Sequence, residues 1–212
     1  APALHAEIKA NPGFFVELIV ACFRSAADEP TDAEVSEEGS PAEEYTEQQR
    51  ATAGRAWEVL RSCDQVPGVR EDGTVDVAAL SDWIDAVRDG LAAVDRTVIG
   101  DLQIGELLCH APTNDDGSPF SSEVRDLLER IGSNEIMRGI AVGTFNSRGV
   151  TSRGLTDGGG QEWQLAKSYR AYAAGAGAWP TVRRLFEGIA EHYEAEARRE
   201  DLAAERRRQG LR

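Results

Sequence analysis

One run of apolar residues constrains the fold more than any other feature of this chain. Between residues 77 and 94 apolar side chains recur at steps of three and four, at Val77, Leu80, Ile84, Val87, Leu91 and Val94. This spacing places them on one face of an α-helix. Shorter stripes of the same period recur along the chain, and no stretch alternates with the period of two that marks a strand. The sequence therefore predicts an all-α fold, an irregular array of about eight helices in antiparallel hairpins.

Capping residues indicate where several of these helices begin. Asn11 followed by Pro12 is a typical helix start, although the apolar run 14–23 could also form a strand. Pro180 begins the last and longest helix. Large apolar residues are scarce in its final part, residues 194–212, so we expect that part to project as a charged helix into solvent or onto a partner.

The 212 residues are enough for one domain, 1–212, with a substantial core. Residues 28–47 hold nine acidic side chains and no basic one, which indicates a solvated loop or linker. The alternative is that this tract docks a basic partner or covers the chain's own arginines. The net charge of −14 also disfavours nucleic acid as a partner.

Composition also bears on where the protein works. No apolar run is long enough to span a membrane, and three isolated cysteines are typical of a reducing compartment. We therefore expect a cytoplasmic protein. The chain does not begin with Met, and we expect it to be excised from a longer protein.

Motifs for metal binding or catalysis are weak. The segment REDGTVDVAAL resembles part of a calcium loop, but Gly68, Arg70 and Ala79 occupy positions that require oxygen ligands. A turn followed by Asp76 as a helix N-cap explains the same residues. No histidine or cysteine lies in a recognised metal or nucleophile pattern, and carboxylates such as Glu106 or Asp157 have no catalytic spacing. We expect no metal, no cofactor and no enzymatic activity.

The glycine-rich stretch FNSRGVTSRGLTDGGGQEW is the candidate ligand site. Glycines before a helix leave backbone N–H groups free, and nearby arginines add positive charge, so the loop 146–160 could hold an anion. The candidate binding residues are Arg148, Arg153, Gly158, Gly159, Gly160 and Gln161. The stretch matches no known phosphate-binding motif, and the alternative is a structural joint between helices.

Aromatic residues gather in the C-terminal third and serve either the core or an interface. Protein interfaces favour exposed tryptophan and arginine. The candidate interaction residues are Trp163, Trp179, Arg198 and Arg199.

Three stretches, NPGFFVELIVACFR, REDGTVDVAALSDWIDAVRDG and RGIAVGTFNSRGV with the following GGGQEWQLAKSYRAYA, resemble the C-terminal helical region of large bacterial multidomain proteins of uncharacterised function. The resemblance implies an excised helical domain of a bacterial cytoplasmic protein, without an assigned activity, in a system of the defence type. It carries over no functional residue.

Together these observations predict a non-catalytic helical domain for protein interaction or scaffolding. Its partner would be another protein or another domain of the same polypeptide, and its oligomeric state is left open. The alternative function is a sensor module that binds an anionic small molecule or nucleotide at the loop 146–160.

Overall fold

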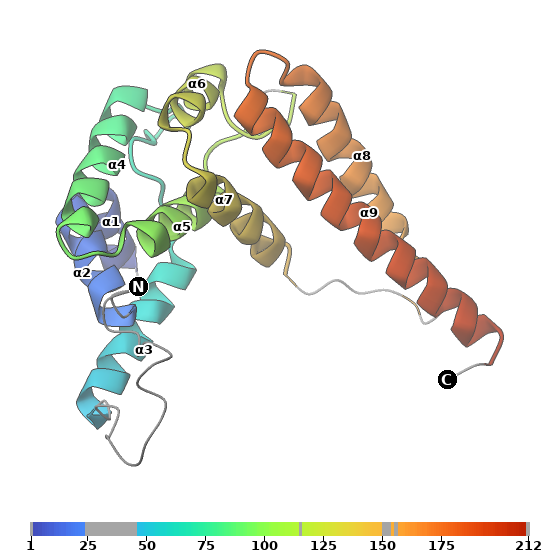
Figure 1. The fold of residues 1–212 in the computed structure, drawn as a ribbon, viewed down its shortest axis with the longest axis horizontal. Coiled ribbons are helices and arrows are strands. Elements are labelled where there is room, and N and C mark those ends of the chain that lie inside the picture. Colours follow the sequence, from blue (N-terminus) through green and yellow to red (C-terminus); the bar gives the residue numbers. More distant parts are fainter. Residues whose placement is uncertain (1, 24–45, 115, 150–153, 155–156, 211–212) are drawn as a thin grey trace, which may run out of the picture.

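The computed structural model describes residues 2–23, 46–114, 116–149, 154 and 157–210. Within these ranges the chain forms nine helices and no strand, which confirms the predicted all-α fold and the long C-terminal helix (Figure 1). The helices are α1 (Pro2–Ala10), α2 (Pro12–Cys22), α3 (Glu47–Ser62), α4 (Val77–Ala92), α5 (Thr97–Leu108), α6 (Ser122–Ile131), α7 (Asn134–Ser147), α8 (Gly160–Gly175) and α9 (Pro180–Arg208).

Side chains cap the helix starts where the sequence predicted them. The Asn11 side chain accepts hydrogen bonds from the first backbone N–H groups of α2, so residues 12–22 are helical and the alternative of a strand is wrong. Asp76 caps α4 by accepting from the backbone N–H of Ala79 at 3.1 Å, as predicted for the calcium-like segment. Most of the acidic tract lies outside the described residues, but Glu47 is already the first residue of α3.

Helices α1 to α5 share an apolar core with α6 and α7. The stripe of α4 that the sequence predicted is buried at Leu80, Ile84, Val87 and Leu91. The indole N–H of Trp83 donates to the carbonyl of Ile8 at 3.0 Å and ties α4 to α1. In Figure 1 these helices form one side of the molecule, and α8 and α9 extend from the other as an arm.

Helices α5 and α7 cross at very short range because glycines face each other. An added Cβ at Gly105 would lie 2.1 Å from the carbonyl oxygen of Ile136, and one at Gly139 would lie 2.0 Å from that of Leu102. No other residue fits at either position without moving the backbone of the partner helix. This crossing anchors the centre of the molecule.

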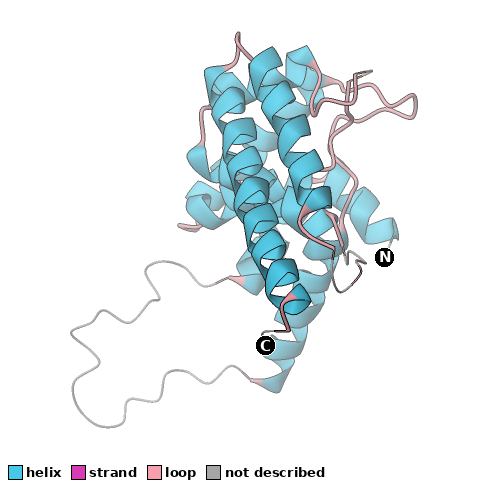
Figure 2. Cartoon of the chain, turned by 90° about the vertical axis from the view of Figure 1, so that its right-hand side faces the viewer, coloured by secondary structure: helices cyan, strands magenta, loops and turns pink. Residues whose placement is uncertain are grey.

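Helices α8 and α9 form an antiparallel hairpin and pack side by side along the length of α8 (Figures 1 and 2). Aromatic rings fill the interface near the middle of the hairpin. Tyr169 lies 6.1 Å from Phe186 and 6.0 Å from Tyr193, measured between ring centroids. Core packing is therefore the role of these C-terminal aromatic residues, while α9 extends past the start of α8.

Candidate functional site

Arg148, the first candidate anion ligand, follows the last residue of α7 and contacts the hairpin of α8 and α9. Its guanidinium lies 2.5 Å from the carboxylate of Glu162 and 3.6 Å from that of Glu196. The guanidinium also lies over the ring of Tyr193, 5.6 Å from its centroid. Glu162 is completely buried, and a buried carboxylate requires such a partner. Arg148 thus joins α7 to the hairpin, and its charge is balanced within the chain.

The start of α8 already has a carboxylate bound to it. The backbone N–H of Gly159 donates to Asp201 Oδ1 at 2.8 Å, and the indole N–H of Trp163 donates to Asp201 Oδ2 at 2.9 Å. These two hydrogen bonds, that of Trp163 first, lower the pKa of Asp201. A Cβ added at Gly159 would lie 2.4 Å from the Cα of Ala197. The glycine therefore lets α9 approach closely enough for Asp201 to take the place of an external anion.

Helix α9 begins in the same way. Its first backbone N–H groups, those of Thr181 and Val182, donate to Glu129 Oε1 of α6 at 2.5 and 2.9 Å. The unpaired backbone N–H groups at a helix start attract anions. At both ends of the hairpin this anion is a carboxylate of the same chain, Asp201 at one end and Glu129 at the other.

The other candidate ligand residues of the loop differ in their surroundings. Gly160 and Gln161 are exposed in the first turn of α8, Gly158 is half-buried beside Asp201, and Arg153 lies outside the described residues. Asn146 and Ser147 belong to α7 and not to a loop. The binding of an external anion here stays a prediction, but the contacts of Arg148 and Gly159 are those of a joint.

The candidate interaction residues separate into two places. The guanidinium of Arg198 lies over the ring of Trp163 at 5.6 Å, and Trp163 is 39% exposed. Trp179 lies at the opposite end of the hairpin, where its indole N–H donates to Asp126 and Arg125 lies over its ring. Trp179 therefore belongs to the contact with α6, whereas Trp163 and Arg198 lie together at the free end of the arm.

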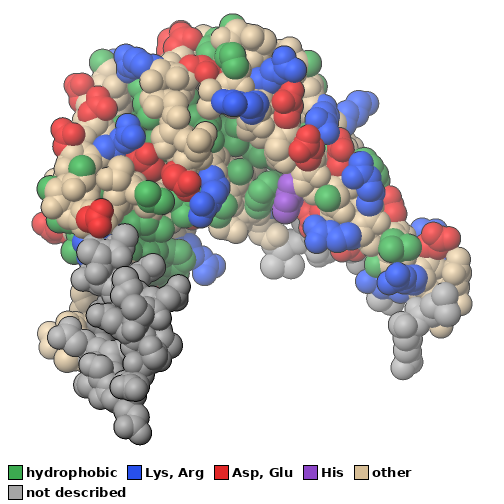
Figure 3. Space-filling view, viewed as in Figure 1, with side chains coloured by type: hydrophobic (Ala, Val, Ile, Leu, Met, Phe, Trp, Pro, Cys, Tyr) green, Lys and Arg blue, Asp and Glu red, His purple; other side chains and the backbone are tan. Residues whose placement is uncertain are grey.

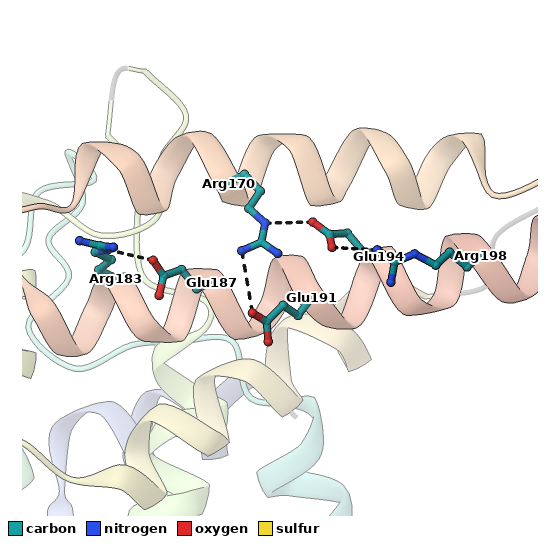
Figure 4. Close-up of polar contacts among 6 residues, drawn as sticks. All are labelled: Arg170, Arg183, Glu187, Glu191, Glu194 and Arg198. Atoms are coloured by element: carbon teal, nitrogen blue, oxygen red, sulfur yellow. Dashed lines mark hydrogen bonds and ion pairs between the residues drawn. The ribbon is translucent and has the colours of Figure 1, made fainter.

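One face of the hairpin neutralises its own charge (Figure 4). Arg170 of α8 contacts Glu194 at 2.9 Å and Glu191 at 3.9 Å on α9. Along α9, Arg183 pairs with Glu187 at 2.8 Å, and Arg198 pairs with Glu194 at 3.3 Å. Exposed pairs of this kind contribute little to stability, but on this face three arginines and three glutamates offset one another's charge.

A second face of α9, which we call the α9 stripe, carries arginines and no acidic residue. Its residues follow one another at steps of three and four, and all but the first are exposed: Thr181, Arg184, Gly188, His192, Ala195, Arg199, Leu202 and Arg206. None of the acidic residues of α9 lies in it, since these occupy other positions: Glu187, Glu191, Glu194, Glu196, Glu200, Asp201 and Glu205. A chain with a net charge of −14 thus presents three arginines on one uninterrupted face.

The first half of the α9 stripe borders a groove against α7. The groove has a volume of about 380 Å³ and is lined by Asn134, Met137, Arg138, Ala141, Phe145, Thr181, Arg184, Leu185, Gly188, Ile189 and His192. Ala141 is small, and a Cβ added at Gly188 would meet nothing within 4 Å. Small residues on both helices therefore leave a channel over an apolar floor. Figure 3 shows basic and acidic side chains interspersed along the arm, with apolar ones in the hollow beside it.

Arg199 is a predicted interaction residue, whereas the other members of this surface were not predicted from the sequence. Their signal was the spacing of Arg184, Arg199 and Arg206 without an intervening acid, which is visible once the last helix is drawn as a helix. The α7 wall had no such signal, because its residues are far from those of α9 in the chain.

The part of the chain that the structure describes contains no group of three or more His, Cys, Asp or Glu side chains placed to hold a metal ion. Among the helices described above, none is long and apolar enough to cross a membrane.

Comparison of the chain with protein-family models, with curated proteins and with solved structures found no match.

Proposed function

We propose that this chain is a non-catalytic interaction domain of a cytoplasmic protein, and that it binds an acidic amphipathic helix along the α9 stripe. The helix would belong to another protein or to another segment of the same polypeptide. One observation carries the proposal: three exposed arginines follow a helical spacing, without an acid among them, and lead into an apolar groove.

The shape of the groove suits a helix. Helices recognise grooves through apolar side chains at helical spacing, and the channel between α7 and α9 offers apolar contacts from Met137, Leu185 and Ile189. Gly188 and Ala195 would let a partner backbone approach α9 closely, because small residues leave room between helices.

The charges suit an acidic partner. Arg184 and Arg138 line the groove on opposite helices, and Arg138 already pairs with Glu135 at 2.9 Å. Arg184, Arg199 and Arg206 supply the positive face, which continues beyond the groove. Glutamates flanking the apolar face of a partner helix would meet these guanidinium groups, and such charge complementarity sets the choice of partner and the rate of association.

The proposal also accounts for the two sides of the arm. On the ion-pair face of Figure 4, arginine and glutamate neutralise each other. A basic partner would meet Arg184, Arg199 and Arg206 on the α9 stripe and be repelled, so the arrangement discriminates between partners by charge.

Site-specific photo-crosslinking in cells that produce the full-length protein tests this function. A photo-reactive residue at Ala195 reports on the α9 stripe, and one at Val98, which is 67% exposed on α5, is the matched control. We expect a discrete adduct with an acidic helical segment from position 195 and none from position 98.

Two variants sharpen the test. Gly188→Leu fills the groove, whereas Gly54→Leu adds the same side chain at another exposed helical glycine with open space around it. Loss of the adduct only in Gly188→Leu and in Arg184→Glu/Arg199→Glu supports the proposal. An adduct that survives both changes, or equal labelling from positions 195 and 98, contradicts it.

A further inference from the structure

A second cavity lies on the other side of α7, away from the groove and the hairpin. It has a volume of about 570 Å³ between α2, α3, α5 and α7 and is lined by Phe15, Trp57, Leu60, Arg61, Cys63, Gln103, Glu106, Leu107, His110, Gly143, Asn146 and Ser147. This volume falls within the range of small-molecule sites, roughly 300–1,000 Å³.

The cavity wall carries one group of each charge. Glu106 is half-buried on α5, where it accepts a hydrogen bond from the side-chain amide of Gln103 at 3.0 Å. Arg61 is in the last turn of α3. Neither forms an ion pair with any residue that the structure describes. Both charges are thus available to a ligand.

Burial raises the pKa of Glu106, because removal of water disfavours the charged carboxylate. A positive group of a ligand would compensate this carboxylate. An anion without a positive group would be repelled by Glu106, and a simple amine would be repelled by Arg61, so the pair of charges favours a zwitterion.

The apolar part of the wall is aromatic at one end. Phe15 is buried, whereas Trp57 is 40% exposed although it is large and apolar. The ring of Phe23 lies edge-on to that of Trp57, with 6.0 Å between the ring centroids. Leu60 and Leu107 extend this surface. Aromatic rings of this kind bind apolar and aromatic side chains of ligands.

We propose that this cavity binds a free α-amino acid with an apolar or aromatic side chain. The ammonium group pairs with Glu106, the carboxylate pairs with Arg61, and the side chain lies against Phe15 and Trp57. Asn146 and Ser147, at the end of α7, supply further polar groups at the cavity wall. This site is separate from the α9 stripe and does not depend on the proposed interaction function.

Isothermal titration calorimetry of the whole chain tests the site. The probes are the free amino acids with aliphatic or aromatic side chains, together with phenethylamine and 3-phenylpropionate, which are phenylalanine without its carboxylate and without its amine. We expect at least one amino acid to bind, and either deletion from phenylalanine to weaken binding by about tenfold or more.

Variants assign the two charges. Glu106→Gln and Arg61→Gln should each weaken amino-acid binding about tenfold, while Arg55→Gln, an exposed arginine of α3 outside the cavity, leaves it unchanged. Thermal melting of each variant checks its fold. Trp57→Ala removes the partly exposed ring and should weaken binding without a cost to the core, so the site can be tested even if a charge variant fails to fold.

Three results overturn the proposal. They are no heat from any of the amino acids at about 10 mM, equal binding of phenylalanine and either of its one-charge analogues, or binding that is insensitive to Glu106→Gln, Arg61→Gln and Trp57→Ala in folded protein.

Discussion

Two helix pairs hold this molecule together by different means. Helices α5 and α7 cross through glycines, so that the backbone of one nearly touches the backbone of the other at Gly105 and Gly139. Helices α8 and α9 run side by side with aromatic rings between them, the buried pair of Arg148 and Glu162 at one end, and ion pairs along an exposed face.

The two helix pairs differ in what limits them: backbone packing at the α5–α7 crossing, and side-chain contacts and charge in the α8–α9 hairpin. The glycine crossing leaves no space for a side chain, so even the methyl group of an alanine would displace the backbone of the partner helix. The hairpin relies on side chains that can move, except where Glu162 is buried and where Gly159 lies against the backbone of Ala197. The centre of the molecule is therefore expected to be intolerant of small changes of volume, and the arm to be sensitive mainly to changes of buried charge.

Gly139→Ala should produce the largest effect. Its Cβ would lie 2.0 Å from the carbonyl oxygen of Leu102, so the helices must separate, at an expected cost of about 3 kcal/mol in the free energy of unfolding. Gly54→Ala is the matched control, because this exposed glycine of α3 has open space around it and the change should stabilise by about 1 kcal/mol. Urea unfolding followed by circular dichroism measures both, and equal effects at the two sites would refute the close crossing.

Arg148→Ala should have the next largest effect. It removes a partner of the buried Glu162 carboxylate, and we expect a loss of about 2 kcal/mol because a buried acceptor that loses a hydrogen-bond partner is costly. Arg198→Ala, which removes an exposed arginine from the same hairpin, should change stability little. If Arg148 is instead reserved for an external anion, its removal leaves the urea midpoint unchanged and abolishes ligand-induced stabilisation.

Asp201 should have the smallest effect, and the effect should disappear in acid. Its pKa is lowered in the folded state by the hydrogen bonds from Trp163 and Gly159, so its contribution to stability is present above the unfolded-state pKa of about 4. The contribution is lost as the pH falls from there through the lower folded-state pKa. Melting temperatures of wild type and Asp201→Asn should therefore converge in acid and differ near neutral pH. A constant difference at all pH values would show that the carboxylate charge is not involved.

A helix with one buried and one exposed face leaves a periodic apolar pattern in the sequence. A helix that is buried on several sides leaves no such pattern. Helix α4 has one apolar face against the core, so its stripe was evident. Helix α5 has no such stripe, because it is buried on several sides at Gly100, Asp101, Ile104, Gly105 and Leu108 and has no polar face to create a period. Its polar Asp101 is buried only because Arg88 and Ser133 contact it.

The candidate sites show the same limit. The glycines before α8 correctly indicated a helix start that would attract an anion, but nothing in the local sequence indicated Asp201, forty-two residues away from Gly159. The cavity between α3, α5 and α7 likewise joins Arg61 and Glu106 from separate helices, and Glu106 had no catalytic spacing in the chain.

The sequence by itself determined the all-α class, the caps at Asn11 and Asp76, and the long C-terminal helix, because each depends on residues within a few positions of one another. Tertiary structure alone decided which charges are balanced and which stay available to a partner. Arg148 and Arg199 look alike in the chain, but only folding brings Glu162 and Glu196 to the first and leaves the second on an exposed face. Charge compensation depends on distance in space, and a sequence records distance only along the chain.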